Sequence, residues 1–134
     1  MHHAMQGIHL WAVLVAAASA FMLGGIWYGP LFKNAWCREA GVDPDATPGH
    51  PARIFGGAFV LSLVAAFAFA CYLGPAPRLH LALHTGLYVG VAFVATSFGI
   101  NYLFAGRSLK LWLIDGGYHT LQFVLYGLIL GLWH

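Results

Sequence analysis

The sequence predicts an all-α integral membrane protein, a bundle of four transmembrane helices. Three observations lead to this fold class. Hydrophobic residues make up 60% of the 134 residues and charged residues only 7%, whereas a soluble domain has about 25% charged residues. The apolar residues form four runs, each close to the ~20 residues that a helix needs to cross a bilayer. The connections between these runs hold nearly all of the basic residues.

The same composition excludes other classes of protein. Aromatic residues alone supply 16% of the chain, which is incompatible with disorder. Two cysteines cannot staple a secreted disulfide fold, and a net charge of +2 is too small for a nucleic-acid-binding surface. Strands of a membrane barrel would be about 9–11 residues of alternating polarity, unlike these runs. We therefore expect one membrane domain, residues 1–134, with the lipid bilayer as its partner.

The four predicted spans cover residues 8–28, 52–73, 81–105 and 109–133. Lys and Arg occur only near their ends, and only the fourth span contains an acid. Within the first span, Ala18-Ser19-Ala20 resembles a signal-peptide cleavage site. No Lys or Arg precedes it and the apolar run continues beyond it, so a retained helix is the better interpretation.

The first connection contains apolar residues at helical spacing: Leu31, Phe32, Ala35, Trp36 and Ala40. Polar and charged residues lie between them. We expect a short amphipathic helix in the headgroup layer, with Trp36 as its anchor and Gly41 at its end. The segment that follows, residues 43–51, is rich in turn-forming residues.

The basic residues are unevenly divided among the connections. The first and third connections hold five of them: Lys33, Arg38, Arg53, Arg107 and Lys110. Arg78 alone lies in the second connection. Because connections rich in Lys and Arg stay in the cytoplasm, we expect a bacterial inner-membrane protein with both termini in the periplasm.

Small residues recur every fourth position in the first two spans. They are Ala12, Ala16, Ala20 and Gly24 in one, and Ala58, Ser62, Ala66 and Ala70 in the other. The third and fourth spans carry the pairs Gly86/Gly90 and Gly127/Gly131. Such faces allow close packing of helices in lipid, where the hydrophobic effect does not drive association. They predict the helix contacts, and faces left over favour a homodimer or a larger membrane complex.

Asp115 is the most informative polar residue, because an acid within a span usually marks a pathway, a relay or an ion pair. His119 lies one turn further on the same helix face, and the rise of ~1.5 Å per residue puts Asn101 at a similar depth. The candidate cluster on this inner half also includes Trp27, Tyr28 and Tyr118. The structural alternative is that Asp115 caps a helix or pairs with Arg107 or Lys110.

Histidines offer a weaker prediction at the other side of the membrane. His80 and His84 are four residues apart and are weak candidates for a metal or haem site. His84 and His119 differ in depth by about 16 Å, so they cannot hold one haem within a monomer. The sequence has no motif for nucleophilic catalysis, no phosphate-binding loop and no CxxC pair. We predict no cofactor and no metal, and Cys37 and Cys71 should not pair.

The chain contains a weak internal sequence similarity. Gly25-Ile26-Trp27-Tyr28 and Gly99-Ile100-Asn101-Tyr102 agree at three of four positions and lie at equivalent depth. Two parallel helix-pair repeats would produce this similarity, and so would chance in so biased a composition.

Several stretches resemble a family of small bacterial membrane proteins catalogued as domain of unknown function 1761. The resemblance rests on WYGPLFKNAW at residues 27–36, and on Asn101–Phe104, Leu113–His119 and Gly127–Trp133. Family members often have Ser where this chain has Gly29, and a Gly before the lysine that is missing at Lys33. The resemblance implies four membrane helices and no established activity. It adds weight to six residues: Trp27, Tyr28, Pro30, Asn101, Asp115 and His119.

Different classes of function remain open from the sequence. In the first, the inner-half cluster binds a proton, an ion or a small polar solute. Asp115 then carries the charge, His119 exchanges protons with it, and Asn101 orients the group by a hydrogen bond. In the second, the chain is a structural or accessory subunit whose small-residue faces dock a larger membrane complex. A haem-binding, metal-binding or enzymatic membrane protein is the third, and we expect a non-enzyme.

Overall fold

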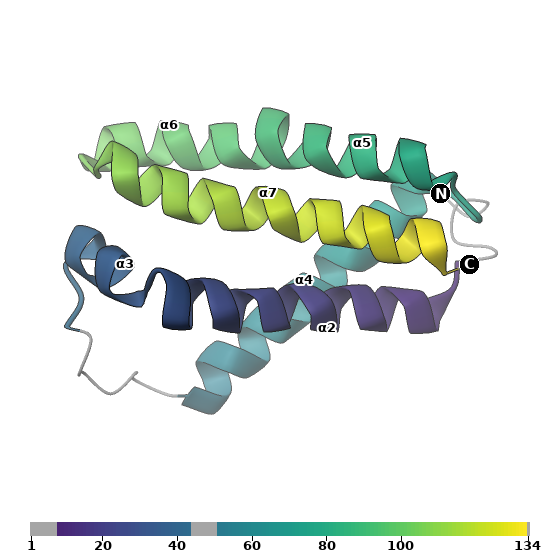
Figure 1. Ribbon diagram of the computed structural model, residues 1–134, viewed down its shortest axis with the longest axis horizontal. Coiled ribbons are helices and arrows are strands. Elements are labelled where there is room, and N and C mark those ends of the chain that lie inside the picture. Colours follow the sequence, from purple (N-terminus) through teal and green to yellow (C-terminus); the bar gives the residue numbers. More distant parts are fainter. Residues whose placement is uncertain (1–7, 44–50, 134) are drawn as a thin grey trace.

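The computed structural model describes residues 8–43 and 51–133 (Figure 1). The helical elements in chain order are α2 (Leu10–Ile26), the π-helical turn η1 (Trp27–Leu31), α3 (Lys33–Ala40), α4 (Pro51–Leu73), α5 (Leu79–Val89), the π-helical segment η2 (Gly90–Ala95), α6 (Thr96–Ala105) and α7 (Leu109–Leu132). Neither described range contains a strand. The predicted all-α fold class is therefore confirmed.

Three stretches are long and apolar enough to cross a membrane: Leu10–Leu31, Ala52–Leu73 and Leu79–Ala105. They correspond to the first three predicted spans. Helix α7 has 24 residues but is not among them, and it carries Asp115, His119 and Gln122 along its length. Length and apolarity thus identify three spans in the described part of the chain, where the sequence predicted four.

Helix α7 lies at the centre of the arrangement. It contacts α2, α3, α4, α5, η2 and α6, and Figure 1 shows it between the α5–α6 pair and α2, with α4 crossing behind. The first turn of α2 and the last turn of α7 lie at one end, which we call the far end. There the rings of His9 and Trp133 have centroids 5.4 Å apart.

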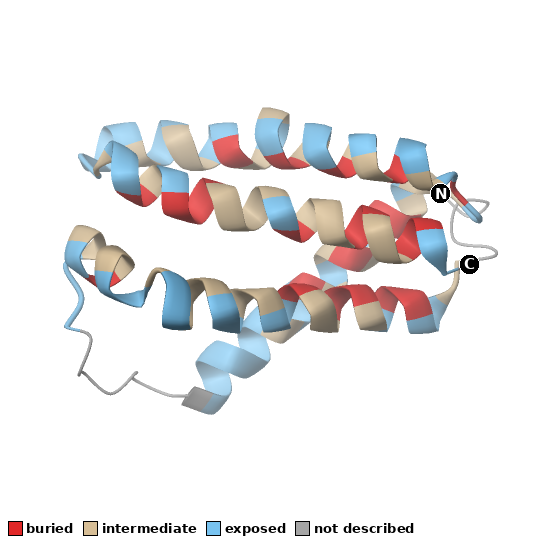
Figure 2. Cartoon of the chain, in the orientation of Figure 1, coloured by how far each residue is buried: buried red, intermediate tan, exposed pale blue. Residues whose placement is uncertain are grey.

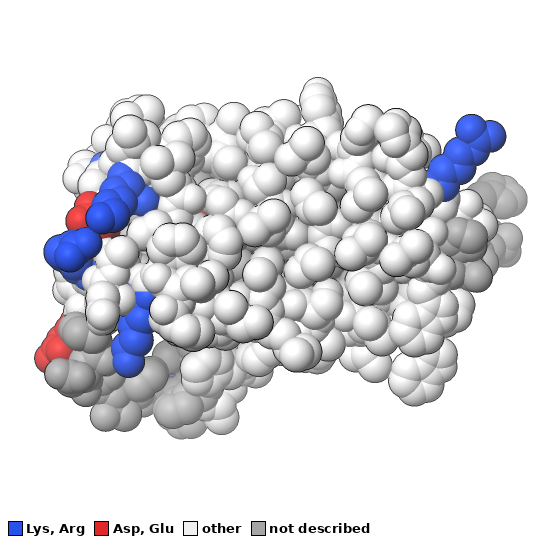
Figure 3. Space-filling view, in the orientation of Figure 1, with Lys and Arg blue, Asp and Glu red and all other residues white. Residues whose placement is uncertain are grey.

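The opposite end carries α3 and the α6–α7 turn. Five of the six basic residues lie in or beside these segments and the start of α4 (Figure 3): Lys33, Arg38, Arg53, Arg107 and Lys110. We call it the basic end. The predicted amphipathic helix is present here as α3, and Gly41 ends it in the left-handed conformation with φ 74°, which glycine adopts without strain.

Most of the predicted small residues lie where helices meet (Figure 2). The fully or almost fully buried ones are Ala12, Ala16, Ala20, Ser62, Ala66 and Ala70. Gly24 is half-buried, and a Cβ there would lie 3.2 Å from the hydroxyl oxygen of Tyr118. Ala58 is exposed, so it does not make the predicted helix contact within the chain. Helix α4 crosses α2 at an angle (Figure 1), and near the start of α4 the contact with α2 is made by Phe55 and Phe59, whose rings meet that of Phe21 edge-on.

Helices α5 and α7 approach each other to backbone contact. A Cβ added at Gly86 would overlap the main-chain carbonyl of Phe123, and one added at Gly127 would overlap that of Ala82. The other two glycines of these faces are almost as close to the opposite backbone: Gly90 and Gly131. Only glycine permits this approach, which maximises dispersion contact between helices in lipid.

Candidate ligand-binding site

The site centres on the carboxylate of Asp115, which lies on the second turn of α7 and is 7% exposed. The Tyr28 hydroxyl donates a hydrogen bond to Oδ1 at 2.6 Å, and the Trp36 indole N–H donates to the same oxygen at 3.1 Å. The Tyr102 hydroxyl donates to Oδ2. These donors belong to η1, α3 and α6. One carboxylate therefore joins four segments of the chain.

The π-helical turn η1 positions the first aromatic residues. Pro30 has no N–H to donate, and Gly29 has non-helical dihedral angles, φ −98° and ψ −105°. The helix therefore kinks where α2 ends. The Trp27 indole donates to the main-chain oxygen of Ile114 at 2.9 Å, and a Cβ at Gly117 would lie 3.1 Å from the Trp27 ring. Gly117 thus makes room for Trp27 beside the site.

Trp36, the predicted headgroup anchor, contacts the protein. It is half-buried, its indole N–H points to Asp115, and its ring meets that of Tyr28 edge-on with centroids 5.9 Å apart. The physical reason is that α3 folds back onto α7. The side of α3 that carries Trp36 and the buried Cys37 covers protein there.

A cavity of ≈ 370 Å³ lies beside the carboxylate at the basic end. Its walls come from α3, α6, α7 and the turns that follow α3 and α6: Trp36, Ala40, Val42, Asn101, Tyr102, Ala105, Arg107, Leu111 and Asp115. Asn101 and Arg107 are exposed, so they form the rim, whereas Asp115 is buried. A guanidinium nitrogen of Arg107 donates to the main-chain oxygen of Ala40 at 3.3 Å.

The predicted pairing of Asp115 with His119 and Asn101 is not what the structure shows. Asn101 reaches the cavity rim, but the donors to the carboxylate are the tyrosines and Trp36. His119 lies with Nδ1 2.7 Å from Oε1 of Gln122, and its ring stacks on Phe98 at 4.7 Å. Asp115 and His119 therefore share a helix face but belong to separate hydrogen-bond networks.

The network of His119 continues into the middle of the bundle. Nε2 of Gln122 donates to the Tyr126 hydroxyl at 2.6 Å, which lies 2.6 Å from Oγ of Ser62 on α4. Tyr126 is fully buried. Closer to the site, the Tyr118 hydroxyl donates to the main-chain oxygen of Ala20 at 2.9 Å. These bonds tie α7 to α4 and to α2.

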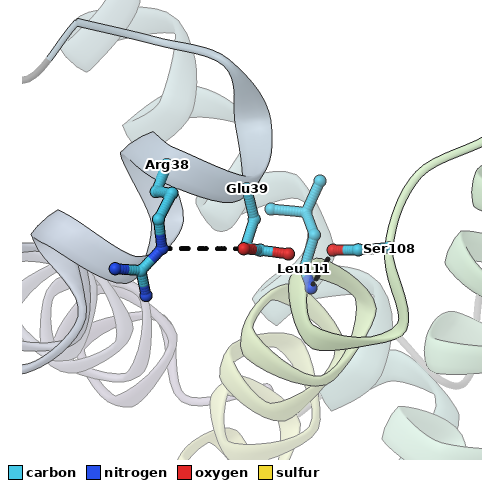
Figure 4. Close-up of polar contacts among 4 residues, drawn as sticks. All are labelled: Arg38, Glu39, Ser108 and Leu111. Carbon is cyan, nitrogen blue, oxygen red and sulfur yellow. Dashed lines mark hydrogen bonds and ion pairs between the residues drawn. The ribbon is translucent and has the colours of Figure 1, made fainter.

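The structural roles proposed for Asp115 are filled by other residues. Helix α7 is capped by Ser108, whose hydroxyl accepts from the Leu111 N–H at 3.1 Å, as Figure 4 shows. Figure 4 also shows an ion pair between Arg38 and Glu39, at 3.7 Å. The alternative that Asp115 caps a helix or pairs with Arg107 or Lys110 is thus wrong.

The described histidines at the far end do not form one cluster. The rings of His80 and His84 are 4.1 Å apart, whereas Nδ1 of His9 accepts from the Ala12 N–H and so caps α2. Within residues 8–43 and 51–133, no group of three or more His, Cys, Asp or Glu residues could hold a metal ion. Both cysteines are free.

Two of the three donors to Asp115, Trp36 and Tyr102, were not among the site residues that the sequence predicted. For Trp36 the sequence carried no signal of this role. For Tyr102 the signal was the similarity between residues 25–28 and 99–102, which places Tyr28 and Tyr102 at equivalent positions. The two hydroxyls donate to the two different oxygens of one carboxylate. The two similar segments, residues 25–28 and 99–102, therefore each supply one tyrosine donor to Asp115.

The model of the family described as "Protein of unknown function (DUF1761)" matches residues 11–131. The chain belongs to this family. The predicted resemblance is confirmed, and the matched range contains Asp115 together with all three of its donors. Comparisons with curated proteins and with solved structures found no match.

Proposed function

We propose that the protein is a membrane bundle of four spans that binds a small cation or polar solute through Asp115. Helix α7 is the fourth span: its 24 residues extend for about 36 Å, enough to cross ~30 Å of hydrocarbon. Its polar side chains bond within the protein, as shown for Asp115, His119 and Gln122. They lower the hydropathy of α7 without facing lipid, which is how polar residues are tolerated in spans.

The observation that carries the proposal is the environment of the Asp115 carboxylate, namely its burial and its hydrogen-bond donors. The carboxylate is buried, and both of its oxygens accept hydrogen bonds from neutral Tyr and Trp groups. A carboxylate has about four acceptor sites, and the three donors fill only part of them. Asp115 also forms part of the cavity wall. A cation or a hydrogen-bond donor that enters the cavity would therefore occupy the remaining acceptor sites of the carboxylate.

The distribution of basic residues supports an orientation for this site. With the basic end in the cytoplasm, the cavity opens to the cytoplasmic side of a bacterial inner membrane and both termini are periplasmic. The exposed apolar side chains on the first turns of α4, such as Ile54 and Phe55, then face lipid or a second copy of the chain in a homodimer.

A second candidate function is structural, and one observation favours it. The donors to Asp115 come from η1, α3 and α6, so the carboxylate could serve to hold the basic end together in an accessory subunit of a larger complex. The variant Asp115→Asn distinguishes the two functions, because the first predicts a loss of cation binding and the second a change in stability. Asn keeps an acceptor oxygen and the size of the side chain, but it removes the charge that attracts a cation.

The test is a binding titration in mild detergent with methylammonium chloride, using sodium chloride at matched ionic strength as the reference. Trp36 contacts Asp115, so intrinsic fluorescence reports the site, and Trp36→Phe identifies that signal. We expect a saturable response in the wild type that Asp115→Asn abolishes. The matched control is Glu39→Gln, an acid at the same end that pairs with Arg38 and does not line the cavity. A wild type without response, together with an Asp115→Asn variant that melts earlier, would establish the structural role instead.

A further inference from the structure

The charges around the cavity narrow the ligand class, provided that the proposed function holds. Asp115 and Arg107 line the same cavity, the first buried and the second exposed. We infer that the cavity binds a small zwitterion, whose ammonium group meets Asp115 and whose phosphate or carboxylate meets Arg107.

Arg107 is placed to hold an anionic group. It follows Gly106, which ends α6 in the left-handed conformation with φ 70°, and one nitrogen of its guanidinium is bonded to the Ala40 carbonyl. Guanidinium has five N–H donors in a planar fork, so most of them stay available to the cavity. A guanidinium held in one orientation binds phosphate or carboxylate through two parallel hydrogen bonds.

The deeper part of the cavity suits an ammonium group. Trp36 and Tyr102 line it and bond to the Asp115 carboxylate. Aromatic side chains beside a carboxylate are a common way of binding ammonium groups. The amide of Asn101 on the rim offers both a donor and an acceptor to the part of the ligand in between.

Charge and size together favour a zwitterion over simpler ligands. A ligand with positive charge alone would leave the Arg107 guanidinium unused and bind more weakly, and a ligand with negative charge alone would meet the buried carboxylate of Asp115. The volume of ≈ 370 Å³ is near the lower end of the roughly 300–1,000 Å³ of ligand pockets. A compact zwitterion with its two charges a few bonds apart fits these limits.

Such a group can come from two sources. The basic end lies where lipid headgroups lie in the proposed orientation, so the headgroup of phosphatidylethanolamine is one source. Free phosphoethanolamine has the same chemistry and is the other. Both place an ammonium and a phosphate two carbon atoms apart.

The first arm of the test measures binding of free phosphoethanolamine and ethanolamine to the detergent-purified protein. We expect phosphoethanolamine to bind at least about tenfold more tightly, because a hydrogen bond to a charged group adds this much. Arg107→Gln should remove this advantage and leave ethanolamine binding unchanged. Lys110→Gln, an exposed basic residue near Arg107 that does not line the cavity, should keep it.

The second arm measures lipid retention by native mass spectrometry after reconstitution with phosphatidylethanolamine or phosphatidylglycerol. Retention of phosphatidylethanolamine that Arg107→Gln abolishes supports the inference with the headgroup as the source. Binding in the first arm alone supports it with a free solute. Equal affinity for ethanolamine and phosphoethanolamine, with no lipid preference, overturns the zwitterion and leaves the cation site at Asp115 standing. If neither solute binds and no lipid is preferred, both the zwitterion and the cation site at Asp115 are overturned.

Discussion

The far end and the basic end of the bundle are held together by different kinds of contact. At the far end, α5 and α7 touch through their backbones, because Gly86 and Gly127 carry no side chain. At the basic end the contact is made by large aromatic side chains, and Tyr28, Trp36 and Tyr102 meet on one carboxylate. The first arrangement depends on dispersion forces at short range, and the second on hydrogen bonds.

The difference has a consequence for function. The far end contains a cavity of only ≈ 20 Å³, while the basic end contains one of ≈ 370 Å³. The backbone contact between α5 and α7 leaves little space between these helices. The aromatic side chains that converge on Asp115 leave a cavity beside it. In the proposed function the ligand binds at the basic end, whereas the closest helix packing lies toward the far end.

The largest effect is expected at the far end. In Gly127→Leu the new side chain would overlap the backbone of Ala82, so α5 and α7 must separate. Overpacking costs about 1–3 kcal/mol or more, and here the obstacle is backbone that cannot move aside. We expect no monodisperse protein on size-exclusion chromatography in detergent. Gly25→Leu is the control, because a Cβ at Gly25 meets no atom within 4 Å; equal tolerance of both variants would contradict the glycine contact.

A smaller loss is expected when the basic end is disrupted. Asp115→Ala leaves the hydrogen-bond donors of Tyr28, Trp36 and Tyr102 without their acceptor. A donor that stays buried costs about 1–3 kcal/mol, but Trp36 and Tyr102 line the cavity, where water can replace the lost acceptor. The thermal unfolding temperature in detergent should fall clearly, while the protein still purifies as a folded species. An unfolding temperature equal to that of the wild type would mean that the carboxylate holds nothing together.

The contact between α2 and α4 allows a comparison within one helix. Ala66 is fully buried and Ala58 is exposed. We expect Ala66→Leu to lower stability by about 1–3 kcal/mol and Ala58→Leu to have almost no effect, because a leucine at that position faces lipid. Thermal unfolding of both variants in the same detergent checks this. A larger loss in Ala58→Leu would mean that the first turns of α4 pack against a partner.

The smallest effect concerns a single hydrogen bond. Tyr102→Phe removes the donor to Oδ2 of Asp115 and keeps the ring. Such bonds between membrane helices contribute about 0.5–2 kcal/mol. We expect a small decrease in stability that disappears in the Asp115→Ala background, as measured by a double-mutant cycle. Additive losses in the cycle would show that the two side chains do not act through each other.

The sequence was sufficient for the centre of the site and for the helix faces. Asp115 is an acid in an apolar run, Tyr28 lies at its depth, and glycines at every fourth position predicted the contact of α5 with α7. The separation of five basic residues from Arg78 predicted the basic end. Each of these features depends only on composition and spacing along one helix.

The sequence was not sufficient for how the helices are rotated. Asn101 and Tyr102 have nearly the same depth, but neighbouring residues point about 100° apart around a helix, and Tyr102 is the one that faces Asp115. The π-helical segment Gly90–Ala95 precedes them and shifts the helical register. Ala58 was misplaced for a related reason, since the angle at which α4 crosses α2 depends on side chains of both helices.

Hydrogen–deuterium exchange of the wild type and Asp115→Ala in detergent tests most directly whether one carboxylate holds the basic end. Local opening raises exchange only in the segments that lose their contacts. We predict faster exchange at residues 27–40 and 96–107, with residues 60–72 and 79–88 unchanged. Unchanged exchange at residues 27–40, or an equal increase along the whole chain, would contradict the account.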